Sequence, residues 1–362
     1  MAEKALSIDY NPFESSTEIR IFVLQRGSGT EPIQCTLCHI PRSQGRYHAL
    51  SYEWGEESED EPIITVNNGP VRIRRNLYEA LKDVRESSRD LQLWVDAICI
   101  NQASLKEKNQ QVAKMGEIFG GAAMVLAWLG TAKDDSDIAM DWMADKTKLR
   151  RNLRGSDPDG PERKAIVTLC HRSYWRRVWI IQELYLSQSF EVRCGTKAIP
   201  FEVFKRSLGT LYALSVEGVV DREMAYSPAF EHVLSHATRR RDPAAFTLYR
   251  WLTMCAMNNF QSTREHDVVY GLLGISHDYQ NGSIRIEVDY GKNPQDVYLD
   301  ALRASPSNWS KSHNYVKLSR MMKLQMDESL KSSVFEILDK MNDDGLLVDD
   351  TLQDVAGTPE MN

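Results

Sequence analysis

The stretch "LQLWVDAICINQ", residues 91–102, decides the fold class of this chain. Its first part, Leu91–Val95, is apolar enough to form a buried strand. Asp96 ends the apolar run, and the polar pair Asn101 and Gln102 follows a few residues later. A carboxylate at the end of a buried strand is costly to desolvate unless it is paired or put to use. The role of Asp96 is therefore the first question that this sequence raises.

Similar apolar runs recur along the first 200 residues and alternate with helical patterns. We expect strands over residues 19–25, 33–40, 47–52, 91–98 and 122–129, and a hairpin of segments 63–66 and 71–74 around the turn residues Asn67–Pro70. We expect helices over residues 77–85, 105–119 and 173–187. Such alternation is typical of a parallel sheet covered on both faces. The sequence therefore predicts an α/β fold with a mostly parallel sheet and an inserted β-hairpin.

The remainder of the chain has a mostly helical pattern, of which "HDVVYGLLGI" (266–275) is the best-defined piece. Residues 341–362 carry acidic side chains but no Lys or Arg, which favours a solvated and flexible tail. We therefore expect an α/β domain over residues 15–200, a helical region packed on it over 201–335, and an acidic tail over 336–362.

Composition excludes several classes of protein. The net charge is −7 and basic residues form only short runs, so nucleic acid is not an expected partner. The longest apolar run, Ala122–Leu129, is far shorter than the roughly 20 residues of a membrane-spanning helix. The sequence also lacks a secretion signal at its start, so we expect a soluble, cytoplasmic protein with reduced thiols. Cys35 and Cys38 have no second pair at zinc-finger spacing, and we expect no metal site.

The motifs of several common enzyme classes are absent from the sequence. It contains no GxxxxGK[ST], GxGxxG, HExxH or GxSxG pattern, which argues against P-loop NTPases, Rossmann dehydrogenases, zincins and α/β-hydrolases.

The candidate site residues lie instead near the ends of predicted strands, where ligands bind in open α/β sheets. The predicted strand 47–52 delivers Ser51, Tyr52, Glu53, Trp54 and Gly55, and the strand 91–98 delivers Asp96, Asn101 and Gln102. The predicted helix 173–187 adds Trp179, with Glu183 one turn later.

Each candidate has a structural alternative. Asp96 could simply hydrogen-bond the loop after its strand, and Glu183 could form an ordinary salt bridge with Arg176 or Arg177. The tryptophans could belong to the core.

Three segments together resemble the signature blocks of the fungal heterokaryon incompatibility (HET) domain. They are "YHALSYEWGE" (47–56), "LWVDAICINQ" (93–102) and "RRVWIIQELYLS" (176–187). Further on, "STREHDVVYGLLGI" (262–275) resembles the element that commonly follows this domain. The resemblance covers about residues 15–275. It implies a role in fungal non-self recognition, in which incompatible cell fusion triggers programmed cell death.

The HET domain is in turn similar to Toll/interleukin receptor (TIR) domains, which have a flavodoxin-like fold. Several TIR domains cleave NAD+ with one glutamate in a pattern like S-x-W-C-x-x-E-L. In "SYWRRVWIIQEL" the Trp, Glu and Leu of that pattern match Trp179, Glu183 and Leu184, whereas Arg177 and Ile180 stand where the Ser and Cys would be.

The resemblance therefore implies that Glu183 is the catalytic carboxylate of an NAD+ glycohydrolase. By the same reasoning Tyr52 or Trp54 would hold the pyridinium ring, and Asp96, Asn101 and Gln102 would hold ribose hydroxyls. NAD+ would be the substrate, and no bound cofactor is expected.

Three hypotheses follow from the resemblance. The chain could be an NAD+-consuming enzyme, or a non-enzymatic death-signalling module that works through self-association or through protein partners. It could also be a scaffold whose helical C-terminal half senses a partner. A cleft shared by Glu183, Asp96 and the segment Ser51–Gly55 would favour the enzyme. Burial of Glu183 in a salt bridge, with no cavity beside it, would favour the module.

Overall fold

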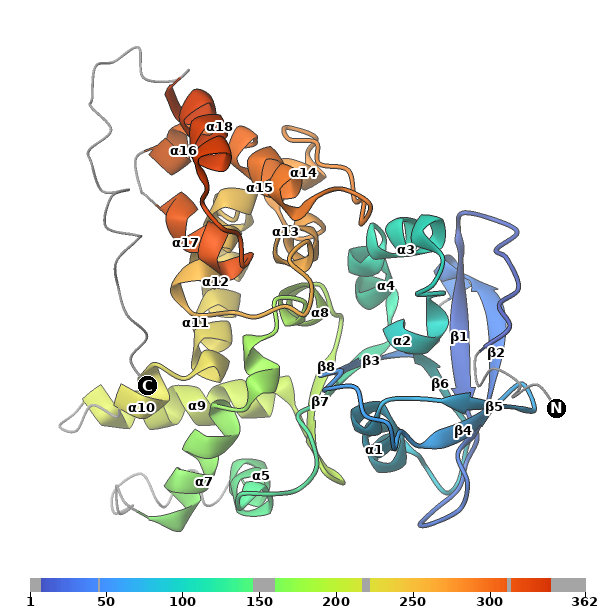
Figure 1. Cartoon of the computed structure of the whole chain (residues 1–362). Helices are drawn as coiled ribbons and strands as arrows, with labels where there is room; N and C mark the ends of the chain where they lie inside the picture. The colour runs from blue at the N-terminus through green and yellow to red at the C-terminus, as the bar shows by residue number, and fades with distance from the viewer. Residues whose placement is uncertain (1–7, 45, 146–159, 217–221, 311–313, 340–362) are drawn as a thin grey trace.

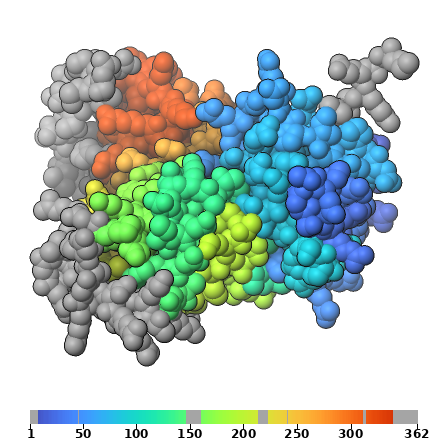
Figure 2. Space-filling model, turned by 90° about the horizontal axis from the view of Figure 1, so that it is seen from below, coloured from blue at the N-terminus to red at the C-terminus, as the bar shows by residue number. Residues whose placement is uncertain are grey.

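The computed structural model describes residues 8–44, 46–145, 160–216, 222–310 and 314–339. Within these residues a sheet part is followed by a helical part that lies beside it (Figure 1). The space-filling view shows the middle of the chain, in green, beside the blue N-terminal residues and below the orange C-terminal residues (Figure 2). No helix among the described residues is both long and apolar enough to cross a bilayer.

The sheet part is built on a nine-stranded sheet with the order β5-β4-β2-β1-β6-β3-β7-β8-β9. The strands are β1 (Glu18–Leu24), β2 (Gln34–Pro41), β3 (His48–Tyr52), β4 (Ile63–Val66), β5 (Gly69–Arg72), β6 (Leu91–Trp94), β7 (Met124–Trp128), β8 (Phe190–Cys194) and β9 (Lys197–Pro200). The α/β class predicted from the sequence is confirmed, and so is each expected strand segment, although several bounds differ.

The sheet is mixed, which corrects the expectation that it would be mostly parallel. The neighbours β6-β3-β7-β8 run parallel to one another, and so do β2 and β4. Strand β1 pairs antiparallel with both β2 and β6. The pairs β4–β5 and β8–β9 are antiparallel hairpins. Because β3, β6 and β7 are parallel neighbours, their carboxyl ends meet at one edge of the sheet. The segments that follow β3 and β6 therefore lie close together.

The predicted hairpin is confirmed at β4 and β5. Its two-residue turn consists of Asn67 and Asn68, whose φ angles of 49° and 64° lie in the left-handed region. Asparagine tolerates this conformation, and two such residues match the right-handed twist of the flanking strands. Gly69 and Pro70, expected in the turn, already belong to β5.

The helices of the sheet part are mostly short. They are α1 (Arg75–Val84), α2 (Asp96–Cys99), α3 (Leu105–Val112), α4 (Met115–Gly121), α5 (Ser136–Ala144), α7 (Pro161–Cys170), the 3-10 helix η3 (Ser173–Arg176) and α8 (Ile180–Tyr185). The helix expected over 105–119 is thus divided into α3 and α4. The strand expected over 91–98 ends at Trp94, because Asp96 begins α2 and its carboxylate accepts the N–H of Ala97 at 2.7 Å.

The prediction of a single helix over residues 173–187 is wrong. It is broken between Arg176 and Ile180, where Arg177 has an extended backbone. The N–H of Val178 donates to the carbonyl of Gln261 at 3.0 Å, and the N–H of Gln261 donates to the carbonyl of Arg176 at 2.6 Å. A segment of the helical part therefore supplies the hydrogen bonds that a continuous helix would have made internally.

The helical part begins after the β8–β9 hairpin. Its helices are α9 (Phe201–Val216), α10 (Arg222–Ala225), α11 (Pro228–Arg241), the 3-10 helix η4 (Pro243–Ala245), α12 (Leu248–Met257), α13 (Asp267–Leu273), α14 (His277–Gln280), α15 (Pro294–Arg303), α16 (Pro306–Ser310), α17 (Asn314–Met321) and α18 (Glu328–Asp339). Of the predicted acidic tail, residues 336–339 form the end of α18, and residues 340–362 lie outside the described residues.

Gln182 joins the two parts of the molecule. This residue of α8 is 2% exposed, and its Nε2 donates to the carbonyl of Gly271 at 2.8 Å and to that of Tyr270 at 3.3 Å. Its Oε1 lies between Gly116 and Gly274, at 2.9 and 2.5 Å from where a Cβ would stand on each. Both glycines are therefore needed for α8 to lie this close to α4 and α13.

Replacing Gly274 by alanine should destabilise the protein by about 1–3 kcal/mol, the usual cost of overpacking a core. The new methyl group would meet Gln182 Oε1, which cannot swing aside without losing the bonds to Tyr270 and Gly271. Urea unfolding of the full chain measures this cost. Gly209→Ala is the control: a Cβ at this position in α9 meets nothing within 4 Å, and removing a helical glycine should stabilise by about 0.5–1 kcal/mol. Equal stability of the two variants would contradict this account of the interface.

Candidate functional site

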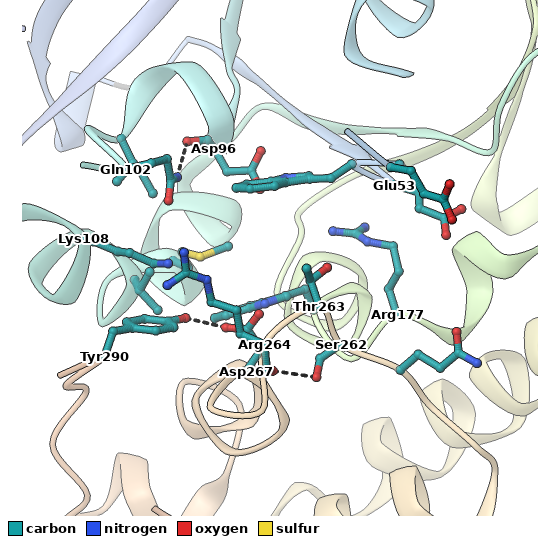
Figure 3. Close-up of a pocket in the computed structure, with 18 of the residues that line it drawn as sticks. Glu53, Asp96, Gln102, Lys108, Arg177, Ser262, Thr263, Arg264, Asp267 and Tyr290 are labelled. Atoms are coloured by element: carbon teal, nitrogen blue, oxygen red, sulfur yellow. Dashed lines mark hydrogen bonds between the residues drawn. The ribbon is translucent and has the colours of Figure 1, made fainter. Parts of the chain in front are cut away.

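A cavity of about 280 Å³ lies where the carboxyl edge of the sheet meets the helical part (Figure 3). The segments after β3 and β6 and the helices α3 and α4 form one side of it, and the segment 261–267 with Tyr290 forms the other. Its polar and aromatic lining residues are Glu53, Trp54, Glu56, Asp96, Gln102, Lys108, Ser173, Arg177, Trp179, Gln261, Ser262, Thr263, Arg264, Asp267 and Tyr290.

Asp96 and Trp54 form a pair in the wall of this cavity. The indole Nε1 of Trp54 donates to Oδ2 of Asp96 at 2.8 Å, while Oδ1 accepts the N–H of Ala97. Burial raises the pKa of Asp96 to about 6, although Arg177 and the Trp54 hydrogen bond partly offset this effect. The carboxylate is therefore ionised at neutral pH but protonated in mild acid.

The segment after β3 is fixed in place by the start of α1. Gly55 has a φ of 73°, in the left-handed region that glycine adopts without strain, and its carbonyl accepts from Arg74 at 2.8 Å. The Arg74 guanidinium lies over the Trp54 ring at 5.2 Å from the ring centroid. Asn76 Nδ2 donates to the carbonyl of Glu53 at 3.1 Å. Trp54 is therefore held in position before any ligand enters.

A largely buried group that we call the Arg177 cluster borders the cavity: Ser51, Tyr174, Arg177 and Glu183. Arg177 donates to both carboxylate oxygens of Glu183, at 3.1 and 3.3 Å. Ser51 Oγ is hydrogen-bonded to Glu183 and lies 2.6 Å from the Tyr174 hydroxyl. The side chain of Glu183 is 3% exposed and that of Arg177 is 15% exposed. The carboxylate of Glu183 is thus fully used by neighbours within the protein.

Arg177, rather than Glu183, lines the cavity. Its guanidinium points toward the cavity in Figure 3. Burial alone would lower the pKa of Arg177, but the nearby Glu183 and Asp96 carboxylates outweigh burial and raise it above its ordinary value. Arg177 is therefore a permanent cation between Glu183 and the cavity.

A second aromatic and charged group combines residues of the helical part with Lys108 of α3. The hydroxyl of Tyr290 donates to Oδ1 of Asp267, and the Lys108 ammonium lies over the Tyr290 ring at 4.0 Å from its centroid. Burial raises the pKa of Asp267 and lowers that of Lys108 to about 8. Arg264 lies beyond the same ring, at 5.7 Å.

The structure brings together some of the residues expected from the sequence. Trp54, Gly55, Asp96, Gln102 and Trp179 all line the cavity, and Gln102 Nε2 donates to the backbone carbonyl of Asp96 at 3.1 Å.

The other candidates lie outside the cavity wall. Ser51 and Glu183 belong to the Arg177 cluster, and Tyr52 is 2% exposed within the core. Asn101 accepts the N–H of Ala103 through its side chain, which shapes the loop before α3. The alternative interpretation of Glu183 as the partner of Arg177 agrees with these contacts. Trp94 and Trp175 are core residues at 1% and 0% exposure.

Sequence reasoning missed the residues that arrive from remote segments. These are Lys108, Ser173, Arg177, Asp267, Tyr290 and the segment Gln261–Arg264. One signal could have found part of this set: the segment "STREHD" (262–267) stands in the last block of the family resemblance, and four of its residues line the cavity.

Comparisons with known proteins agree with the resemblance noted in the sequence. Residues 47–183 match the family model described as "Heterokaryon incompatibility protein (HET)". The chain is also distantly homologous to "Heterokaryon incompatibility protein 6, OR allele" of Neurospora crassa, with 25% identity over 364 aligned residues. That alignment covers 82% of this chain and 53% of the relative, so the chain spans about half the length of the relative. Solved structures gave no significant match.

Asp96→Asn should change stability in a pH-dependent way. The pKa of Asp96 is about 6 in the folded protein, and its ordinary value is 3.8. At a pH between these two values the folded protein binds a proton on Asp96 that the unfolded chain does not bind. The contribution of Asp96 to stability therefore falls as the pH rises from about 4 to about 6. We expect the free energy of unfolding of Asp96→Asn, relative to the wild type, to rise by about 1–3 kcal/mol between pH 4 and pH 7. A relative stability that is the same at both pH values would contradict the burial of this carboxylate.

Glu183→Gln should destabilise the fold by about 3–5 kcal/mol, because it leaves the buried guanidinium of Arg177 without its counter-charge. Glu191→Gln is the matched control, since the Arg193–Glu191 pair is 21% exposed on both sides and should contribute less than about 1 kcal/mol. Urea unfolding at pH 7 compares the two. Similar costs for both variants would show that the Arg177 cluster is not the constraint described here.

Proposed function

We propose that this chain, which carries a HET domain over residues 47–183, acts in fungal heterokaryon incompatibility and triggers programmed cell death by hydrolysing NAD+ at the nicotinamide–ribose bond. The name of the Neurospora relative supports the incompatibility role. The similarity of the segment around Glu183 to TIR domains supports the NAD+ chemistry. The observation that carries the proposal is the Trp54–Asp96 pair in a cavity at the carboxyl edge of parallel strands.

The reaction needs little from the protein beyond an anion and a cavity that holds the nucleotide. The bond between C1′ and the pyridinium nitrogen breaks, and its electron pair leaves with neutral nicotinamide, so no acid has to protonate the leaving group. Positive charge then develops on the ribose, and one ionised carboxylate beside C1′ stabilises it. Water adds to C1′ and gives up a proton, which the same carboxylate can accept.

Asp96 is the carboxylate that the geometry favours for this task. It lines the cavity, and a pKa of about 6 keeps it ionised at neutral pH yet basic enough to take a proton. Gln102 lines the cavity beside it and suits the ribose hydroxyls. Trp54 and Trp179 offer indole rings to the pyridinium, a contact worth roughly 0.5–2 kcal/mol.

Glu183, which the TIR resemblance makes the catalytic residue, acts in this proposal as a positioning residue. Its carboxylate holds Arg177, and Arg177 lines the cavity. The Arg177 charge in turn lowers the pKa of Asp96 against the effect of burial. Loss of Glu183 would therefore disturb the site without removing a group that touches the substrate.

The burial of Glu183 in the Arg177 cluster also favours the second candidate function, a death-signalling module that works by self-association. In such a module the cluster would only stabilise the fold, and the cavity would stay unused. Activity would then depend on protein concentration but not on NAD+.

Nicotinamide release from NAD+ by the full chain tests the enzyme. We expect Asp96→Asn to lower kcat/KM on the order of 10²–10³-fold. The matched control is Asp83→Asn: Asp83 also accepts from an indole, that of Trp128 at 2.8 Å, and burial also raises its pKa, but it does not line the cavity. It should keep activity within about threefold of the wild type, a change worth less than 1 kcal/mol.

The pH profile separates the roles of the two carboxylates. In the Glu183→Asp variant, which retains the charge, kcat/KM should still fall below about pH 6 as Asp96 is protonated, and in Asp96→Asn this limb should be gone. An acid limb that persists in Asp96→Asn would make another carboxylate, such as Glu183, the catalytic residue. If the wild type releases no nicotinamide at either dilute or high protein concentration, the enzyme hypothesis is rejected and the self-association module remains.

A further inference from the structure

Lys108 is an unusual residue in the cavity because it is buried and no carboxylate is hydrogen-bonded to it among the described residues. This lysine of α3 is 7% exposed. Among the described residues its ammonium has no hydrogen bond or salt bridge to a carboxylate, and its close contact is the face of the Tyr290 ring. The nearby carboxylate of Asp267 already accepts from the Tyr290 hydroxyl. The charge of Asp267 offsets part of the cost of burying Lys108, but the ammonium keeps hydrogen-bonding capacity that no carboxylate uses.

A second cation stands next to it. Arg264 lies over the same tyrosine ring, and its charge contributes to the lowered pKa of Lys108. Figure 3 shows the two side chains next to each other, below Asp96 and Gln102 in this view. Like charges this close repel each other, and the repulsion is relieved when an anion binds between them. With a pKa of about 8, Lys108 still carries its charge at neutral pH.

The residues around Lys108 are held rigidly by contacts between the two parts of the molecule. Asn109, the next residue of α3, donates to Oδ1 of Asp289 at 3.0 Å and accepts the N–H of Tyr290 at 3.0 Å. The Tyr270 hydroxyl donates to the carbonyl of Asp289 at 3.0 Å. These bonds fix the tyrosine ring below the ammonium before any ligand binds.

We propose that Lys108 and Arg264 form an anion subsite that binds the phosphate groups of a nucleotide. If the proposed function is correct, the anion is the pyrophosphate of NAD+. The cavity then has two chemically different ends: the Trp54–Asp96 end takes the nicotinamide ribose, and the Lys108–Arg264 end takes the phosphates. The identity of the nucleotide rests on the proposed function, whereas the subsite itself rests on the two cations.

Calorimetric binding of two probes to the full chain tests the subsite. ADP-ribose carries a pyrophosphate, and nicotinamide riboside carries no phosphate. We expect Lys108→Met to weaken ADP-ribose binding at least about tenfold and Arg264→Gln to weaken it by a similar factor, as the loss of a charged hydrogen bond predicts. Binding of nicotinamide riboside should change less than about twofold in both variants. Lys106→Met is the control, because Lys106 is an exposed cation of the same helix and does not line the cavity.

The outcomes separate the subsite from the proposed reaction. ADP-ribose binding that depends on Lys108 and Arg264, in a chain that does not cleave NAD+, would support the subsite and reject the reaction. NAD+ cleavage whose KM is unchanged in both variants would support the reaction and overturn the subsite. Equal weakening of both probes would overturn the subsite as well, since the variants would then act on the cavity as a whole. Arg264 is exposed, so its variant keeps the test valid if Lys108→Met fails to fold.

Discussion

The buried cation of Arg177 is the constraint on which the rest of the structure depends. On the sheet side its guanidinium is neutralised by Glu183, which Ser51 at the carboxyl end of β3 also contacts. On the helical side the backbone around Arg177 pairs with Gln261. One residue thus links the sheet, the break between η3 and α8, and the segment that begins the far wall of the cavity. Moving it would disturb all three.

This arrangement explains why the cavity belongs to neither part alone. The sheet part supplies Trp54 and Asp96 at its carboxyl edge, and the helical part supplies Arg264 and Tyr290. Gln182 beside Glu183 holds the two parts together through α13, so neighbouring residues of α8 maintain the interface and the cavity wall. A change in how the helical part packs would therefore alter the cavity directly. In a signalling protein, such a dependence would let binding of a partner to the helical part change the reaction in the cavity.

Much of the sheet could be predicted from the sequence because apolar runs and turn residues act locally. The Asn67–Asn68 turn and the strand β7 needed no information from elsewhere. Asp96 and Trp54 were placed near each other by the general rule on strand ends. The break at Arg177 could not be predicted, because its hydrogen bonds come from Gln261, far away along the chain. The same holds for Lys108 and Tyr290, which meet only through the packing of α3 against residues 289–290. The pattern around Glu183 suggested a helix face with a carboxylate at its edge, and only the packed structure pairs that carboxylate with Arg177.

The central claim is that the cavity between the two parts is a nucleotide site in which Asp96 faces the ribose and Lys108 faces the phosphates. A crystal structure of the full chain with ADP-ribose tests it most directly. The account predicts the ligand in this cavity, with its pyrophosphate oxygens on Lys108 and Arg264, its terminal ribose beside Asp96, and Glu183 still paired with Arg177. A ligand bound elsewhere on the chain, or one whose ribose contacts Glu183 in place of Asp96, would contradict it.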